Sequence, residues 1–511
     1  MTADRLILGG DGRTQAVQLT RMSNRHGLIT GATGTGKTVT LQVLAEAFSR
    51  AGVPVFAADV KGDLSGIAAP GKPHKEVDRR TALCAVSQHQ LRGYPTVFWD
   101  VFGERGHPVR TTVSELGPLL LSALLELNET QSGILYACFA IADDQGMLLL
   151  DLKDLRAMLA WMSENASALR REYGNITAAS VGAIQRRLLV LEEQGADRFF
   201  GEPALDLKDL MRKDYSGLGV ISLLDSDRLL RDSPKLYAAF LLWLLSELFE
   251  DLPEAGDLDR PKVVLFFDEA HLLFNGMPKS LVEKIEQVFR LIRSKAVGVY
   301  LVTQSPMDVP ENILGQLGLK VQHALRAFTP KDQQALRGVV AGYRNDAGLD
   351  LAALVTNLGV GEAIVSSLDA QGAPSNAMAV TIAPPESRIG PLTDEERQSR
   401  VADSPLAGRY DTETDRESAY EILAGRAEKA AQREAEAEAA AARERETEEA
   451  RKREEAQRKA REKEEARKAR EANRGRSRQG IGETLLKSAV STIGRSLGNK
   501  LVRGILGSLL K

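Results

Sequence analysis

The feature that most constrains this chain is the glycine-rich stretch at residues 31–38, GATGTGKT, which matches the pattern G-x-x-x-x-G-K-[ST]. It follows the apolar run GLIT at residues 27–30 and opens a helical pattern at Val39. A strand, a glycine loop and a helix N-terminus in this order direct backbone N–H groups at phosphate oxygens. The stretch therefore predicts an α/β fold and a nucleotide phosphate site, formed by Gly31, Ala32, Thr33, Gly34, Thr35, Gly36, Lys37 and Thr38.

The last two residues of this loop have the chemistry for distinct tasks. We expect the ammonium of Lys37 to reach the β- and γ-phosphates of ATP, and the hydroxyl of Thr38 to bind Mg²⁺. The alternative is a plain glycine-rich turn, which the flanking strand and helix patterns disfavour.

A second motif is the run VVLFFDEAH at residues 263–271, in which a buried strand ends in two carboxylates. In open α/β sheets this edge of the sheet binds ligands. We expect Asp268 to hold Mg²⁺ through water and Glu269 to polarise the attacking water as a general base. A strand-to-helix turn capped by Asp268 is the alternative. His271 either couples this site to a neighbour or caps a helix.

Two further strand ends point to the same edge. The run VYLVTQSP at residues 299–306 places Gln304 after an apolar strand, where it would contact the γ-phosphate or the attacking water, unless it only caps a helix. The polar turn DVKGDLSG at residues 59–66 follows another strand, with a surface turn as its alternative.

Residues 1–395 have the pattern of a mixed α/β domain, and 43% of the whole chain is apolar. Alternating strand and helix patterns predict a mostly parallel sheet covered on both faces. Residues 105–215 are mostly helical, either as an inserted subdomain or as a packed part of the same domain. We expect strands over 26–30, 53–59, 96–101, 219–224, 263–268, 297–303 and 362–368, and helices over 37–50, 113–127, 131–142, 178–194, 234–249 and 280–294.

The overall composition excludes several classes of protein. Two cysteines cannot form a disulfide scaffold or a cysteine-rich zinc site, and they suit a reducing cytoplasm. A net charge of −3 argues against a generally basic nucleic-acid coat, but it leaves room for a local basic channel. No apolar run approaches the length of a membrane-spanning helix.

The last quarter of the chain changes character. Residues 396–423 are polar and predict a linker, and residues 424–478 are rich in Ala, Glu, Lys and Arg with recurrent i,i+4 charge pairs. This composition favours a single solvated helix, with a disordered charged linker as the alternative. Residues 479–511 form a basic amphipathic stripe, which would dock a partner, a second copy or a membrane surface, or fold back onto the core.

Together, the glycine loop, the DVKGD turn, the DEAH strand end and the VTQSP strand end resemble the HerA/FtsK superfamily of P-loop ATPases. More narrowly, the chain resembles the bacterial HerA-like helicase proteins of the DUF853 family. It does not resemble DEAH-box helicases, because no second RecA-like domain follows. Only about 30 residues precede the glycine loop, so we do not expect the N-terminal β-barrel of true HerA proteins.

The resemblance implies a RecA-like core with an additional strand, and a hexameric ring that translocates or unwinds DNA while hydrolysing ATP with Mg²⁺. It matches Lys37 and Thr38 to the phosphate-loop residues, Asp268 and Glu269 to the metal-associated and catalytic carboxylates, and Gln304 to the polar sensor. Arginine fingers would act across subunits, with Arg293, Arg326 and Arg337 as candidates and a surface or ion-pairing role as the alternative for each. The alternative is an assembly or switch ATPase that acts on a protein or membrane partner, peripherally attached through its C-terminal segment.

Overall fold

The computed structural model of the chain describes residues 4–474, except 276–278, 327–329 and 347. The chain divides into two compact units, Met1–Arg426 and Ala427–Lys511.

The first unit is built on a large sheet with parallel and antiparallel parts. From β10 through β3, β9, β8, β4, β7 and β5 to β6 all neighbours are parallel, whereas β11, β12, β1 and β2 continue the other side in antiparallel pairs. In spatial order the strands are β2 (Gln15–Leu19), β1 (Arg5–Gly10), β12 (Met378–Ile382), β11 (Glu362–Ser366), β10 (Leu319–Gln322), β3 (Gly27–Thr30), β9 (Val297–Thr303), β8 (Val263–Phe267), β4 (Val55–Asp59), β7 (Ile221–Asp225), β5 (Thr96–Asp100) and β6 (His107–Pro108).

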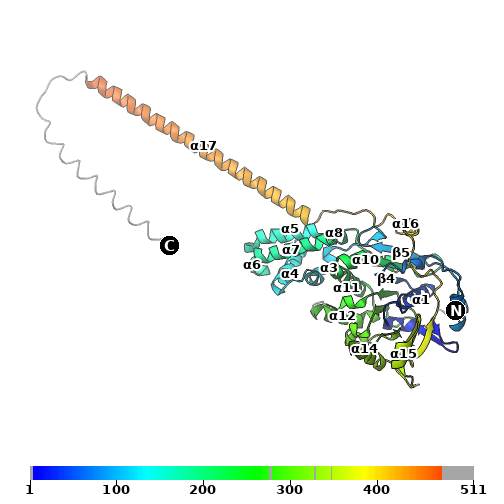
Figure 1. Ribbon diagram of the computed structural model, residues 1–511. Helices are drawn as coiled ribbons and strands as arrows, with labels where there is room; N and C mark the ends of the chain where they lie inside the picture. The colour runs from blue at the N-terminus through cyan, green and yellow to red at the C-terminus, as the bar shows by residue number, and fades with distance from the viewer. Residues whose placement is uncertain (1–3, 276–278, 327–329, 347, 475–511) are drawn as a thin grey trace. The chain divides into compact units, whose positions relative to one another are not determined.

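Helices cover the sheet (Figure 1). Their bounds are α1 (Lys37–Arg50), α2 (Lys75–Leu83), α3 (Val113–Leu124), α4 (Glu129–Asp144), α5 (Leu152–Glu164), α6 (Ala166–Tyr173), α7 (Ala178–Glu193), α8 (Ala196–Phe199), α9 (Leu207–Leu210), α10 (Asp227–Asp232), α11 (Pro234–Asp251), α12 (Lys279–Leu291), α13 (Glu311–Leu314), α14 (Pro330–Ala341), α15 (Leu351–Asn357), α16 (Asp394–Ala402) and α17 (Ala419–Arg474).

Alternate side chains of the central strands enter two separate cores. In β8, Val264 and Phe266 belong to the core that includes α1, whereas Leu265 and Phe267 belong to the core that includes α3, α4 and α11. Successive residues of a strand point to opposite faces, so the two cores lie on the two faces of the sheet. Every residue of β8 and β9 is buried, as expected of strands covered on both sides. The predicted α/β fold with a mostly parallel sheet is confirmed.

The predicted helical insertion is present between β6 and β7, where it contains α3 to α9. Helices α4, α5, α6 and α7 gather at one end of the unit (Figure 1). Their buried residues, such as Leu135 and Met158, belong to the same core as Leu265 of β8. The insertion is therefore a packed part of the first unit, one of the two arrangements that the sequence left open.

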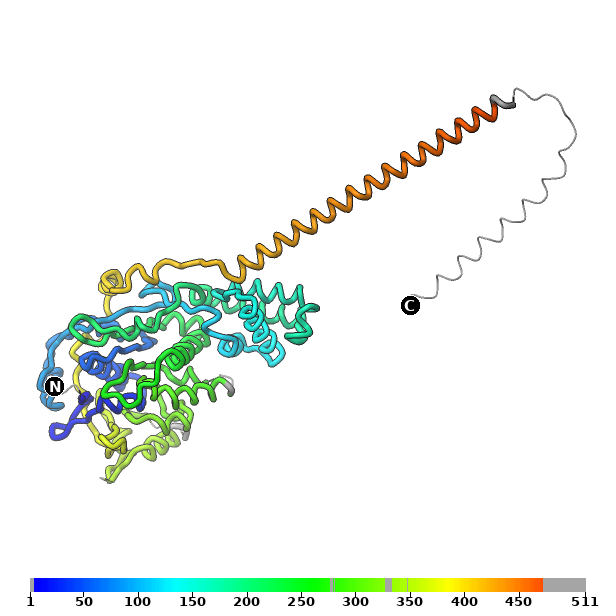
Figure 2. The backbone as a smooth tube through the Cα atoms, turned by 180° about the vertical axis from the view of Figure 1, so that it is seen from behind, coloured from blue at the N-terminus to red at the C-terminus, as the bar shows by residue number. Residues whose placement is uncertain are grey.

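Residues 396–423 differ from the linker that their composition predicts. Figure 2 shows this yellow to orange segment running over the unit from α16 to the start of α17. Tyr410 is buried, its ring lies 5.2 Å from that of Trp99, and its hydroxyl donates a hydrogen bond to Asp209. A few buried side chains such as Tyr410 hold this mostly polar segment against the unit, and the average composition of the segment does not reveal them.

Helix α17 begins on the insertion. The hydroxyl of Ser418 and the backbone N–H of Tyr420 both donate to the carboxylate of Asp154, and Leu423 is buried. The anchored first turn thus belongs to the first unit.

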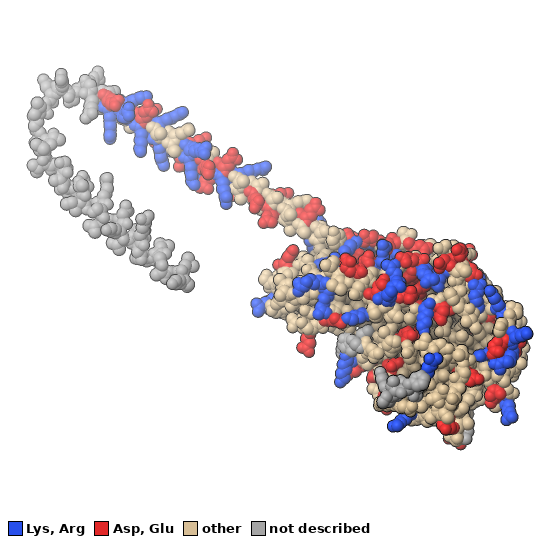
Figure 3. Space-filling model, in the orientation of Figure 1, with Lys and Arg blue, Asp and Glu red and all other residues tan. Residues whose placement is uncertain are grey.

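The second unit contains the exposed remainder of α17. Lys, Arg and Glu side chains are interspersed along it (Figure 3), with ion pairs between Glu448 and Lys452 at 2.8 Å and between Glu464 and Lys468 at 3.1 Å. The predicted long charged helix is confirmed. The predicted amphipathic segment, 479–511, lies outside the described residues. Among the residues described, none of the helices is long and apolar enough to span a bilayer.

Candidate nucleotide-binding site

The glycine-rich loop joins β3 to α1 at the carboxyl edge of the parallel sheet. Gly34 and Gly36 have φ angles of +78° and +117°, a region that other residues rarely adopt. A Cβ atom on Gly36 would also lie 3.2 Å from the backbone of Gly361. The loop therefore requires glycine at residue 36 for both its conformation and its packing.

Lys37, the first residue of α1, is buried against this loop. Its Nζ donates to the carbonyls of Gly31 at 2.7 Å and Ala32 at 3.1 Å. Burial lowers the pKa of Lys37 and the charge of Lys61 adds to this effect, whereas the carboxylates of Asp268 and Glu269 oppose it. The phosphate loop and the carboxylate pair therefore act on the same ammonium group.

Asp268 and Glu269 follow β8, which is separated from β3 only by β9. Burial raises the pKa of Asp268 to about 6, and the neighbouring charge of Glu269 contributes, while Lys61 and Lys37 lower it. The backbone carbonyl of Asp268 accepts a hydrogen bond from the Tyr237 hydroxyl at 3.0 Å. Strands β3, β9 and β8 are parallel, so the two motifs, which follow β3 and β8, lie at the same edge of the sheet.

Glu269 has a left-handed backbone, with φ of +49°, which is uncommon for a residue other than glycine. One carboxylate oxygen lies 3.8 Å from Lys61 Nζ, and the other lies 3.4 Å from His271 Nδ1. His271 thus contacts Glu269, and its two predicted roles, coupling the site to a neighbour or capping a helix, both stay open.

The turn after β4 contacts both halves of the site. Lys61 faces Glu269, and both Lys61 and the nearby Thr38 hydroxyl act against the rise in the pKa of Asp63 that burial causes. Burial raises the pKa of Asp63. The sequence marked this turn as lying on the right edge but assigned no role to Lys61 or Asp63. The available signal was the position of two charged residues directly after a strand.

Gln304 directly follows β9 and is exposed. Because β9 lies between β3 and β8 and is parallel to both, Gln304 is at the same edge as Lys37 and Glu269. Its catalytic role stays a prediction.

The three arginine-finger candidates are scattered. Arg293 precedes β9, at the edge opposite the loop, and lies 3.8 Å from Asp257. Arg337 is on α14, and Arg326 is an exposed residue after β10. None of the described contacts joins them to Lys37 or Glu269 within this chain.

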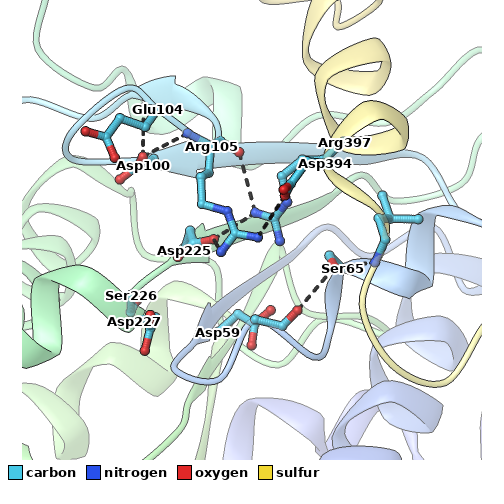
Figure 4. Close-up of polar contacts among 12 residues, drawn as sticks. Asp59, Ser65, Asp100, Glu104, Arg105, Asp225, Ser226, Asp227, Asp394 and Arg397 are labelled. Carbon is cyan, nitrogen blue, oxygen red and sulfur yellow. Dashed lines mark hydrogen bonds and ion pairs between the residues drawn. The ribbon is translucent and has the colours of Figure 1, made fainter.

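A second polar cluster lies at the carboxyl ends of β4 and β7 (Figure 4). Arg397 Nη1 donates to Asp225 at 2.8 Å, and Arg105 lies 3.2 Å from the same carboxylate oxygen. Burial raises the pKa of the adjacent Asp59 to about 7, and the charge of Asp63 contributes. Asp63 lies in the same turn as Lys61, so this cluster continues into the turn that faces Glu269.

A phosphate loop after one parallel strand, and a carboxylate pair two strands away at the same edge, define a P-loop nucleotide-binding protein with a RecA-like core. The family profile described as "Helicase HerA-like C-terminal" matches residues 4–511. The chain belongs to this HerA-like family. The predicted kinship with the HerA/FtsK superfamily is confirmed, and the narrower assignment to the DUF853 family stays a prediction.

Similar solved structures include the bacterial conjugative coupling protein TrwB, with 14% identity over 76% of this chain and 90% of that chain and a TM-score of 0.47. TrwB has also been solved with the GTP analogue GDPNP, at 14% identity over 76% and 91% with a TM-score of 0.48. VirB4 of Thermoanaerobacter pseudethanolicus matches with 17% identity over 74% and 96% and a TM-score of 0.47. No significant match is found among curated proteins.

Proposed function

We propose that this protein is an ATP-hydrolysing motor that assembles as a ring and unwinds DNA or moves along it. One observation carries the enzymatic part. Lys37 of the phosphate loop and the Asp268–Glu269 pair, more than 200 residues apart in sequence, follow the parallel strands β3 and β8, which only β9 separates, so they lie at one edge of the sheet.

Each residue of the site has a task in this proposal. The backbone N–H groups of the loop surround the β-phosphate, and Lys37 exchanges its two carbonyl contacts for phosphate oxygens. Glu269 accepts the proton of the attacking water, while Lys61, 3.8 Å away, holds that carboxylate in place. Gln304 orients the water or the γ-phosphate from the end of β9.

The oxygen donors present also fit Mg²⁺. The Thr38 hydroxyl and the carboxylates of Asp63 and Asp268 are hard ligands, and in P-loop sites one or two carboxylates are completed by phosphate and water. Bound Mg²⁺ would neutralise charge on the phosphates, with Thr38 as a direct ligand and Asp268 acting through water.

DNA as the substrate and a hexameric ring as the assembly rest on membership of a helicase family. A translocating ring needs only local positive loops that face its pore, so a net charge of −3 is compatible with this role. We place the protein in the cytoplasm, where its two free cysteines would stay reduced.

An assembly or switch ATPase with a protein or membrane cargo is the second candidate. The long exposed polar helix α17 favours it, since a helix of this kind suits a tether.

ATP turnover of the full chain, measured with single-stranded DNA, with double-stranded DNA and without DNA, tests the proposal. Lys37→Ala serves as the control that removes phosphate binding, and native mass measurement with and without ATP reports the assembly. We expect DNA to stimulate turnover and ATP to favour a ring. If ATP turnover is unchanged by every form of DNA but rises with lipid vesicles or a protein partner, the motor on DNA is refuted and the second candidate is supported.

A further inference from the structure

A cavity of about 750 Å³ lies at the amino-terminal edge of the sheet, opposite the phosphate loop. Its lining includes Arg25 and His26, which precede β3, and Gly318 and Lys320 beside the start of β10. Strands β3 and β10 are parallel, and the glycine loop follows the other end of β3. The cavity is therefore separate from the candidate nucleotide site.

The charged side chains around this cavity carry one sign of charge. Its cationic lining consists of Arg25, Arg290, Arg293, Lys320 and Arg344. The described lining residues include no aspartate or glutamate. His26 adds no charge at neutral pH, because burial lowers its pKa to about 4 and its Nδ1 accepts a hydrogen bond from the N–H of Val299 at 3.0 Å. A hollow lined by cations alone attracts anions.

Two of the five cations are paired with carboxylates that do not line the cavity. Arg293 lies 3.8 Å from Asp257, and Arg344 Nε donates to Asp346 at 2.7 Å. These two arginines are therefore largely neutralised, and the demand for a negative charge comes from the other three cations.

Arg25, Arg290 and Lys320 form none of the ion pairs found among the described residues. Lys320 is half-buried, its Nζ donates to the carbonyl of Gly342 at 3.0 Å, and burial lowers its pKa. The Nε of Arg25 is buried, and no described group accepts a hydrogen bond from it. Arg290 lies near the end of α12 and is exposed. Buried cationic donors without an acceptor are costly, and an anionic ligand would satisfy them.

The lining also indicates the chemistry of that anion. A guanidinium binds phosphate through two parallel N–H···O bonds, and an ammonium adds a point charge. Phe289, Leu317 and Leu368 contribute apolar wall. A cavity of this volume with apolar walls and a few convergent polar groups is typical of sites for small organic molecules. Three unpaired cations together match a ligand with more than one phosphate group.

We propose that this cavity is a second ligand site, which binds a small organic molecule with two or more phosphate groups. The inference does not depend on the proposed function, because none of its contacts involves the glycine loop. A nucleic-acid strand has the same phosphate chemistry. Such strands are bound by cations and aromatic side chains that follow a groove, whereas these cations surround one cavity.

Calorimetry on the full chain tests the proposal, with fructose 1,6-bisphosphate as the probe. Fructose 6-phosphate, which has one phosphate group, and a single-stranded oligothymidylate are the comparison ligands. All measurements use the Lys37→Ala background, so that the glycine loop does not account for the binding. The test variants are Arg25→Gln and Arg290→Gln. Arg186→Gln is the matched control, since Arg186 on α7 is exposed and forms none of the described ion pairs.

We expect the bisphosphate to bind at one site and the monophosphate to bind at least about tenfold more weakly, because a hydrogen bond to a charged group contributes about this factor. Each of the two test variants should weaken bisphosphate binding at least about tenfold for the same reason. Arg186→Gln should leave it unchanged, and the oligothymidylate should not compete with the bisphosphate.

A second measurement does not require the arginine variants to fold. Acetylation of lysines, followed by mass spectrometry on the chain with both arginines intact, should be slowed by the bisphosphate at Lys320. The exposed Lys208 on α9 should keep its rate.

The outcomes decide as follows. If the bisphosphate does not bind, or binds but leaves Lys320 fully reactive, the second site is refuted. Equal affinity for the bisphosphate in the wild-type arginine background and in both test variants refutes it as well. Binding of the oligothymidylate in place of the bisphosphate, through the same arginines, would show a nucleic-acid site and refute the small ligand. ATP turnover enters none of these results, so a failure here leaves the proposed function unaffected.

Discussion

Arg397 on α16 is a buried cation, and replacing it by methionine should destabilise the first unit. It is only 4% exposed and donates to Asp225 at 2.8 Å, while its guanidinium lies 5.1 Å above the ring of Phe98. Removing one partner of a buried ion pair costs about 3–5 kcal/mol, because the other charge stays buried. Arg105 still pairs with Asp225 in the variant, so we expect a loss near the lower end, about 3 kcal/mol.

The loss should depend on pH in a defined direction. Burial raises the pKa of Asp225, and Arg397 is the first group to oppose that rise. Without Arg397 this pKa rises further, so the folded state holds the proton more tightly than the unfolded chain. A carboxyl group of this kind supports stability below its unfolded pKa and loses that support as the pH rises through its folded pKa. Arg397→Met should therefore cost more at pH 8 than at pH 5.

Urea unfolding followed by tryptophan fluorescence measures both effects at the two pH values. Arg400→Met is the matched control, since Arg400 is an exposed residue of the same helix and should change stability by less than about 0.5 kcal/mol. The double variant Arg397→Met/Asp225→Asn should recover part of the loss. Equal effects of the two arginine variants, or a loss that grows toward pH 5, would refute the role of a buried ion pair.

Three further changes have definite expected results. Glu269→Gln should keep nucleotide binding but lower kcat at least about 100-fold, as for loss of a general base; a steady-state ATPase assay decides, and unchanged turnover would exclude that role. Tyr410→Ala should cost about 3–5 kcal/mol in thermal unfolding through lost packing on Trp99, whereas a loss below about 1 kcal/mol would mean that residues 396–423 are not held as described. Asp59→Asn should stabilise the protein at pH 8 more than at pH 5, because burial raises the pKa of Asp59 to about 7 and the stability lost to this carboxyl grows from its unfolded pKa until the pH passes its folded pKa. Urea unfolding at both pH values checks this, and a larger gain at pH 5 would contradict the sign.

Strands with continuous apolar sequence could be predicted because burial on both faces leaves little choice of residue. All of 263–267 and 297–303 is buried, and both strands were expected. The short strand β10, the edge strand β2 and the neighbouring strands β1 and β12 were not expected. These strands are four to six residues long, and over such a length an alternating or mixed sequence, such as LKVQ in β10, cannot be distinguished from the sequence of a loop.

The candidate site also has a part that the local sequence predicts and a part that it does not. The loop around Lys37 is local in sequence, and the chemistry of Asp268 and Glu269 is clear from the strand end that precedes them. The ion pair between Lys61 and Glu269 depends on the pairing of β4 with β8, which no local pattern encodes. Likewise, the burial of Arg397 depends on a contact with Asp225, 172 residues earlier in the chain.

The hydrogen bond from Gly361 to Thr35 makes the phosphate loop depend on a late part of the chain. The phosphate loop and the loop bearing Val360 are encoded more than 300 residues apart, yet they meet at one backbone contact. A substitution around Gly361 can therefore alter the conformation of the phosphate loop, although the sequence of the loop itself is unchanged.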